Sequence, residues 1–202
     1  MRTILFILIG SVLGIAAGAA AAFWAAGMAG GGLRLGSEVE AGGWTSDWTI
    51  GSKTANPWTR ARVARHGLLA LTKEEAVYFT TATDSEGRRL SEDCTYRVSG
   101  GAMPALWWSI TLYDATSYLP GNRDNALSFD QTKAESGGGG DAWTFLIAAD
   151  GPEEGGWVSS QAAGRFDLTL RLYKPQAALI EDPENVLPAP RIDRLTCAGG
   201  AG

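Results

Sequence analysis

Residues able to do acid–base or nucleophilic chemistry are few in this sequence. His66 is the only histidine, and it stands beside Arg65 in a segment that we expect to be helical. A Ser-His-Asp triad would depend on His66, and no Gly-x-Ser-x-Gly elbow accompanies it. We therefore expect His66 to be solvated or to cap a helix, and we assign no catalytic residue.

Paired carboxylates are the second kind of candidate, because two of them can hydrolyse a glycosidic bond. Asp114 and Asp130 flank one expected loop, and Asp150, Glu153 and Glu154 lie in another. Acidic side chains on loops are usually only solvated, so we do not assign them catalysis. The protein is more simply read as a non-enzyme, and no cofactor is expected.

Two cysteines, Cys94 and Cys197, offer a disulfide. Outside the cytoplasm an even pair favours a bridge, and on the chain-entropy model closing a loop of roughly 100 residues stabilises the fold by about 4 to 5 kcal/mol. The alternative is two buried free thiols. A metal site is not expected, since the sequence has no Cys-x-x-Cys and only one histidine.

Aromatic residues form the most distinctive candidate surface. Trp107 and Tyr113 alternate with Trp108 and Leu112, so they lie on the opposite face of one expected strand. An uncovered face of this kind stacks on sugars or packs against a partner protein. The alternative is that both faces of the strand are buried.

Arg171 lies on an expected strand of the same type. We expect it to form an ion pair with Asp114 or Asp167. The candidate ligand or partner surface therefore comprises Trp107, Tyr113, Asp114 and Arg171.

The N-terminal segment predicts a membrane anchor. No charged residue occurs from Thr3 to Leu33, and residues 4–24 are long and apolar enough to cross a bilayer. Arg2 precedes this segment, which favours a cytoplasmic N-terminus and an exported C-terminus. A cleaved signal peptide is the alternative, and it places the remainder in the same compartment. We expect a single-pass protein of the bacterial inner membrane whose C-terminal domain lies in the periplasm.

The rest of the chain predicts one domain. Residues 1–26 are the anchor or signal segment, residues 27–43 a Gly-rich spacer, and residues 44–202 the folded domain. Two short helices are expected first, at Thr59–Ala70 and at Lys73–Phe79, the second because Thr72 and Glu75 form a capping box.

Strands with a period of two follow these helices. A net charge of −5 without a basic cluster excludes nucleic acid as a partner. The fold class is mainly β, a two-layer β-sandwich of jelly-roll type after two short helices and one transmembrane helix.

Several segments occur in an order that is specific when taken together. They are Arg60-Ala61, Gly67-Leu68-Leu69, Glu75-Ala76-Val77-Tyr78-Phe79, then Asp84, Gly87 and Leu90, the run from Trp107 to Asp114, and the run from Gly164 to Tyr173 followed by Pro175. In these segments the chain resembles the bacterial domain of unknown function 1214 family, from about residue 60 to residue 194.

The resemblance implies a jelly-roll sandwich and no established catalytic residues. Members often carry this domain behind a second β domain, numbered 1254 in the same naming, for which the residues before Trp44 leave no room. A separate chain carrying that companion domain is therefore an expected partner. The chain departs from the family pattern at Gly156-Trp157-Val158, where Asn-Trp-Leu is frequent, and at Lys174, where an aromatic residue is common.

Two functions remain open from the sequence. One is a non-catalytic structural or interaction subunit of the cell envelope. The other is a carbohydrate-binding or glycan-active periplasmic module. A groove lined by Trp107, Tyr113 and a loop acid would favour the second, and a flat patch would favour the first.

Overall fold

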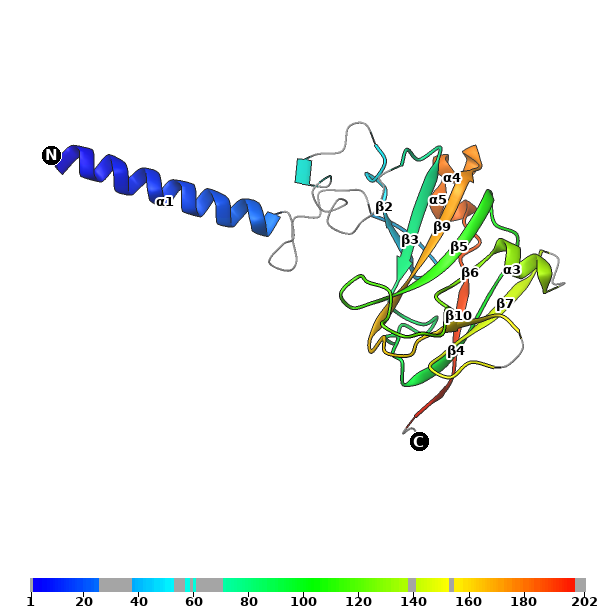
Figure 1. The fold of residues 1–202 in the computed structure, drawn as a ribbon. Helices are drawn as coiled ribbons and strands as arrows, with labels where there is room; N and C mark the ends of the chain where they lie inside the picture. The colour runs from blue at the N-terminus through cyan, green and yellow to red at the C-terminus, as the bar shows by residue number, and fades with distance from the viewer. Residues whose placement is uncertain are drawn as a thin grey trace. The chain divides into compact units, whose positions relative to one another are not determined.

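The computed structural model describes residues 2–25, 38–52, 57–58, 60, 71–137, 141–152 and 155–198 (Figure 1). The chain divides into two units. One consists of residues 1–37 and 49–70, and the other of residues 38–48 and 71–202.

In the first unit, helix α1 spans Arg2–Ala25, and its 24 residues contain no charged residue after Arg2. A rise of 1.5 Å per residue makes it about 36 Å long, against a hydrocarbon core of about 30 Å. The helix is therefore long and apolar enough to cross a membrane, as predicted, although a signal sequence has the same properties. The predicted helix Thr59–Ala70 lies outside the described residues apart from Arg60.

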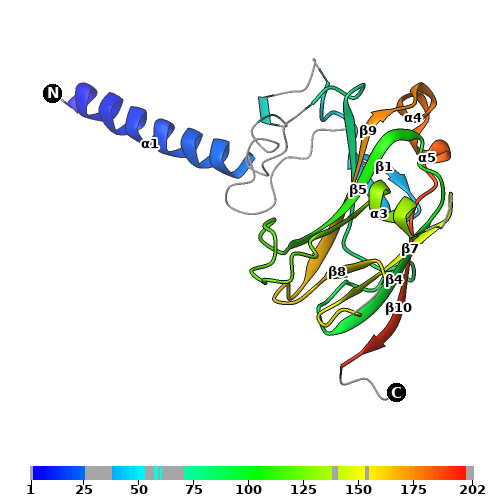
Figure 2. The ribbon, with the colours of Figure 1, turned by 45° about the vertical axis from the view of Figure 1, so that its right-hand side comes forward.

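In the described residues of the second unit, ten strands form two sheets (Figure 2). The six-stranded sheet has the order β1 (Glu38–Ala41), β2 (Trp44–Asp47), β3 (Ala76–Thr81), β9 (Phe166–Pro175), β5 (Ala105–Asp114) and β6 (Ser128–Asp130). The four-stranded sheet has the order β10 (Arg191–Cys197), β4 (Cys94–Gly100), β7 (Trp143–Ala148) and β8 (Trp157–Ser159). Only β7 and β8 pair in parallel among these strands.

The predicted two-layer β-sandwich is confirmed. The chain crosses repeatedly from one sheet to the other, and the late strand β9 lies between β3 and β5, as happens in folds of jelly-roll type. The inward-facing residues alternate along each strand and are almost completely buried. They include Ile110, Leu112, Leu168, Leu170 and Leu172 from one sheet and Tyr96, Val98, Phe145 and Ile147 from the other.

The predicted helix Lys73–Phe79 is wrong. The local capping box does form, since the Thr72 amide donates to Oε2 of Glu75 at 3.2 Å, but it closes a single turn before β3 begins at Ala76. Val77 and Phe79 are buried at alternate positions, and β3 pairs with β9 over its whole length. Beta-branched and aromatic residues fit such a half-buried strand, and this tertiary pairing outweighs the local helix signal.

The sheet also begins earlier than predicted. Strand β1 lies inside the predicted spacer 27–43 and forms a hairpin with β2. The two residues of its turn, Gly42 and Gly43, both have positive φ values, which two-residue hairpin turns require and glycine adopts without strain. Val39 and Ala41 of β1 are buried.

The described residues of the second unit also include three short helices. They are α3 (Gln131–Ser136), α4 (Ala177–Glu181) and α5 (Pro183–Val186). The last two lie in the segment between β9 and β10. Helix α3 begins where β6 ends, and the Asp130 carboxylate caps it by accepting from the Lys133 amide.

Candidate functional site

The candidate site is the side of the six-stranded sheet that faces away from the four-stranded sheet. We call it the outer face. Because side chains alternate along each strand, it carries the residues between the core positions of β3, β9 and β5. They are Tyr78 and Thr80 on β3, Asp167, Thr169, Arg171 and Tyr173 on β9, and Trp107, Ser109, Thr111 and Tyr113 on β5.

The strand register arranges these residues in rows. Tyr78, Arg171 and Ser109 lie opposite one another across β3, β9 and β5. The next row consists of Thr80, Thr169 and Thr111, all with short hydroxyl side chains. Long side chains from the neighbouring rows can therefore extend over the threonine row.

Arg171 and Tyr113 do extend over it. The Arg171 guanidinium donates a hydrogen bond of 2.6 Å to the Tyr113 hydroxyl and lies 5.3 Å from the centre of that ring. Arg171 lies one row to one side of Thr169 and Thr111, and Tyr113 lies one row to the other side. The two threonines are only 6% and 9% exposed. This contact explains why two polar side chains on an outward-facing surface are nearly buried.

Trp107 and Tyr173 form a second pair at the other end of the outer face. They lie opposite each other in the register, with ring centres 5.5 Å apart and planes inclined by 51°. Tyr173 is also close enough to Tyr78 to act on its ionisation. Burial, followed by the neighbouring Tyr173, raises the pKa of Tyr78, and the charge of Arg171 opposes that rise.

The predicted residue Asp114 does not join this surface. Its carboxylate accepts from the Thr116 hydroxyl at 2.6 Å and from the Thr116 and Tyr118 amides, which closes the turn after β5. The Thr116 hydroxyl bond is the main reason that the Asp114 pKa lies below its usual value. The structure therefore brings Trp107, Tyr113 and Arg171 onto one face. The expected ion pair of Arg171 with Asp114 or Asp167 is wrong, because Tyr113 takes that place.

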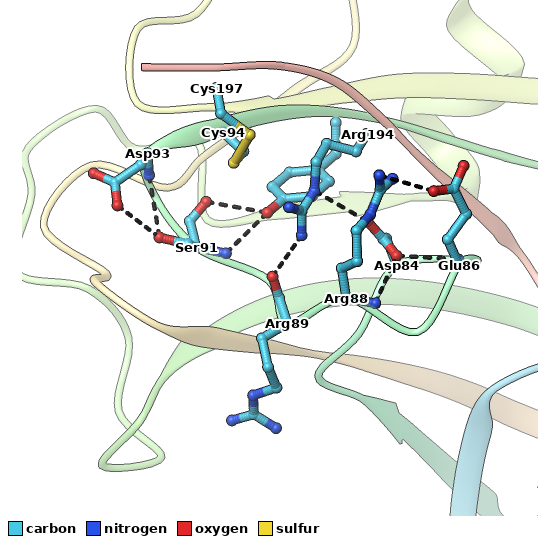
Figure 3. The surroundings of a disulfide bond; sticks show 10 residues. Asp84, Glu86, Arg88, Arg89, Ser91, Asp93, Cys94, Arg194 and Cys197 are labelled. Carbon is cyan, nitrogen blue, oxygen red and sulfur yellow. Dashed lines mark hydrogen bonds and ion pairs between the residues drawn. A yellow bond between two sulfur atoms is a disulfide. The ribbon is translucent and has the colours of Figure 1, made fainter. Parts of the chain in front are cut away.

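The predicted disulfide between Cys94 and Cys197 is present. The two residues lie directly opposite each other in the β4–β10 pairing, so the bridge attaches the last strand to the centre of its sheet (Figure 3).

A polar network beside the disulfide was missed by the sequence analysis. Asp84, whose side chain is 1% exposed, forms ion pairs with Arg88 at 2.9 Å and Arg194 at 3.0 Å (Figure 3). It also accepts from the backbone amides of Glu86 and Arg88. Burial opposes the charged form, but these hydrogen bonds outweigh it and hold the Asp84 pKa below its usual value.

Arg194 extends this network to the core, since its guanidinium lies 5.5 Å from the centre of the Tyr96 ring. Arg194, the distant partner of Asp84 on β10, has no local sequence pattern that would indicate this contact. The network holds the β3–β4 connection against β10, which is a structural role.

The described part of the chain contains no group of three or more His, Cys, Asp or Glu side chains able to hold a metal ion. Three of the residues weighed for chemistry, His66, Glu153 and Glu154, lie outside the described residues.

Comparison with known proteins identifies the family. The family described as protein of unknown function (DUF1214) matches residues 75–177, which contain β3, β4, β5 and β9. The chain belongs to the DUF1214 family. No curated protein matches the chain.

Two solved structures are similar to this DUF1214 chain, and the first of them shows the same fold. The VPA0106 protein from Vibrio parahaemolyticus is 20% identical, with a TM-score of 0.54 over 71% of this chain and 36% of that one. An uncharacterised protein from Burkholderia cenocepacia is 16% identical, with a TM-score of 0.37 over 63% of this chain and 31% of that one. The chain thus spans about a third of the length of each.

Proposed function

We propose that this DUF1214 chain is a non-catalytic interaction subunit of the cell envelope, anchored by α1, with the outer face as its docking surface. The observation that carries this proposal is the composition of the outer face. Trp, Tyr and Arg are the residue types that contribute most to protein interfaces, and Trp107, Tyr113 and Arg171 occupy one sheet face. Their half-buried side chains are already held by neighbours, so docking would order few new rotamers.

The same geometry gives less support to the carbohydrate-binding alternative. Sugar recognition at this face was expected to combine Trp107 and Tyr113 with a loop acid, and the Asp114 carboxylate is engaged in its own turn. Trp107 packs against Tyr173 at an inclined angle, and no flat pair of rings results. The interaction subunit is therefore the function we propose.

Two features support a location outside the cytoplasm. Helix α1 has the length and composition of a membrane span, and the Cys94–Cys197 bridge is of a kind that persists in oxidising compartments. We propose a single-pass protein of the bacterial inner membrane, held by residues 4–24, whose sandwich lies in the periplasm. Alkaline phosphatase fused after Gly202 should be active in cells, and an inactive fusion together with an active cytoplasmic reporter would exclude this topology.

The partner we propose is a separate chain that carries the companion domain 1254. The similar fold in VPA0106 covers only 36% of that protein, so there the fold is joined to a longer polypeptide. We propose that in the present system a second chain supplies the equivalent contacts, with the outer face receiving it.

The test is chemical crosslinking of the tagged full chain in native membranes, followed by mass spectrometry. We expect enrichment of a chain carrying domain 1254, and we expect Trp107→Ala to reduce it. The matched control is Tyr118→Ala, an aromatic residue that is 73% exposed in the β5–β6 connection and does not belong to the outer-face strands. Equal recovery from wild type and both variants would mean that the partner docks elsewhere.

A further inference from the structure

The guanidinium of Arg171 is half-buried on the outer face and has no carboxylate partner among the described residues. Two acidic residues of the same sheet, Asp130 and Asp167, are candidate partners for Arg171, but neither forms an ion pair with it. Asp130 lies in the same row on β6 and caps α3. Asp167 lies opposite Tyr113 in the β9–β5 pairing, and it forms no ion pair with Arg171. A partly desolvated cation usually has a counter-charge close by, so its absence in this part of the chain requires an explanation.

Hydrogen-bond donors gather around this cation. Tyr113 accepts one bond from Arg171, which leaves the hydroxyl hydrogen of Tyr113 available to donate elsewhere. Tyr78 lies directly opposite Arg171 on β3, at the close spacing of cross-strand neighbours, and Tyr173 is two residues from Arg171 on the same face. Tyr78, Tyr113 and Tyr173 thus surround a guanidinium that uses one of its five donor hydrogens on Tyr113.

This arrangement has a definite chemical preference. A guanidinium presents two parallel N–H groups that match the two oxygens of a carboxylate, and phenol hydroxyls donate to the same oxygens. The neighbouring Trp107 and Tyr173 rings would cover the apolar part of a long acidic side chain. The site has the charge and the donors for a planar anion.

We propose that Arg171, with the hydroxyls of Tyr78 and Tyr113, binds a side-chain carboxylate of the protein that docks on the outer face. The proposal of a carboxylate-binding site depends only on the geometry of the outer face. The proposal that the carboxylate belongs to a docked protein rests on the proposed function. Charge complementarity selects an Asp or Glu of the partner as the group that enters between the two tyrosines.

The first arm of the test uses sodium acetate as the probe. The full chain in detergent micelles is titrated at constant ionic strength, with chloride replaced by acetate, and the Nε–Hε signal of each arginine is followed by NMR. The Arg171 signal, assigned by its loss in Arg171→Gln, should shift and saturate at millimolar acetate. The Arg97 signal, from an exposed arginine on β4, should not. Equal and unsaturated shifts at both arginines overturn the site, and a stronger response to inorganic phosphate overturns its preference for carboxylate.

The second arm identifies the source of the carboxylate. Crosslinking to the partner in native membranes is compared for Arg171→Gln and Arg97→Gln. We expect a loss of about tenfold or more for Arg171→Gln alone, since an interfacial cation would then be missing. If acetate binding saturates but Arg171→Gln leaves crosslinking unchanged, the carboxylate does not come from a docked protein. The site would then bind a small carboxylate. Recovery of no partner from wild type defeats the proposed function, while the acetate titration still decides the site.

Discussion

The guanidinium of Arg171 on β9 donates a hydrogen bond of 2.6 Å to the hydroxyl of Tyr113 on β5, although the two residues are not opposite each other in the sheet. Arg171 lies opposite Ser109, and Tyr113 lies opposite Asp167. Their side chains meet over the threonine row between them. The outer face is therefore an ordered polar surface, held by contacts of its own.

Replacing Tyr113 by Phe removes the acceptor of this bond and keeps the ring. Because the bond has a charged donor in a partly buried setting, we expect the free energy of unfolding to fall by about 1 to 2 kcal/mol. Urea denaturation of the full chain in micelles measures it. Tyr118→Phe is the control, since Tyr118 is 73% exposed, and it should change stability by less than about 0.5 kcal/mol. If both variants lowered the unfolding free energy equally, the Arg171–Tyr113 hydrogen bond would not contribute to stability.

The disulfide gives a second prediction. Replacing Cys94 and Cys197 together by Ser should lower the free energy of unfolding by about 2 to 5 kcal/mol, because the unfolded chain loses its crosslink. Dithiothreitol should destabilise the wild type and leave the double variant unchanged. If dithiothreitol lowered the stability of the wild type and the double variant equally, it would not be acting on this disulfide.

The buried carboxylate of Asp84 predicts a pH dependence. Its pKa in the folded protein is lower than in the unfolded chain, so the charged form stabilises the fold. This contribution is fully present above the unfolded pKa of about 4 and is lost as the pH falls through the folded pKa. Stability should therefore decline as the solution is acidified below about pH 5.

A substitution isolates this contribution. Asp84→Asn leaves Arg88 and Arg194 without their shared carboxylate and should cost about 3 kcal/mol near pH 7. The gap between wild type and variant should narrow toward low pH, where wild-type Asp84 is protonated. Asp150→Asn, at an exposed position, is the control. A gap that stayed constant across pH would show that lost packing, and not lost charge, causes the destabilisation.

Two adjacent glycines give a test of the core. A Cβ at Gly100 would overlap the indole ring of Trp143, whereas a Cβ at Gly101 meets only the Asp141 carbonyl oxygen at 4.0 Å. Trp143 packs against Trp108 with ring centres 4.5 Å apart, so it has little room to move. Gly100→Ala should lower the unfolding free energy by about 1 to 3 kcal/mol, and Gly101→Ala should change it much less. Comparable losses in thermal melts would contradict the packing described for Trp143.

Local patterns predicted most of the sandwich because large apolar residues alternate with polar or aromatic residues along the long strands. The alternation of Leu168, Leu170 and Leu172 with polar residues fixes one face of β9, and the same rule placed Trp107 and Tyr113 together. Strand β3 was mistaken for a helix because its capping signal is local and its β-sheet partner lies far along the chain. The Gly42-Gly43 turn was a readable hairpin signal that the Gly-rich context concealed.

Side-chain partners were harder to predict than strand faces. Arg171 was expected to meet a carboxylate, and it meets Tyr113, because the short threonines between them leave room for both side chains. Asp84 and Arg194 come together only through the pairing of β10 with β4, which no nearby residue indicates. Such contacts depend on how strands far apart in the sequence pair with one another. Local sequence patterns do not indicate that pairing.

The central claim is that the outer face receives a partner protein, and site-specific photocrosslinking tests it most directly. A photoreactive phenylalanine analogue is placed at Thr80, which is exposed on the outer face, and separately at Leu195, which is 40% exposed on β10 of the other sheet. After irradiation of intact cells, the account predicts a discrete crosslinked product carrying domain 1254 from position 80 and none from position 195. The same product from position 195, with none from position 80, would contradict it.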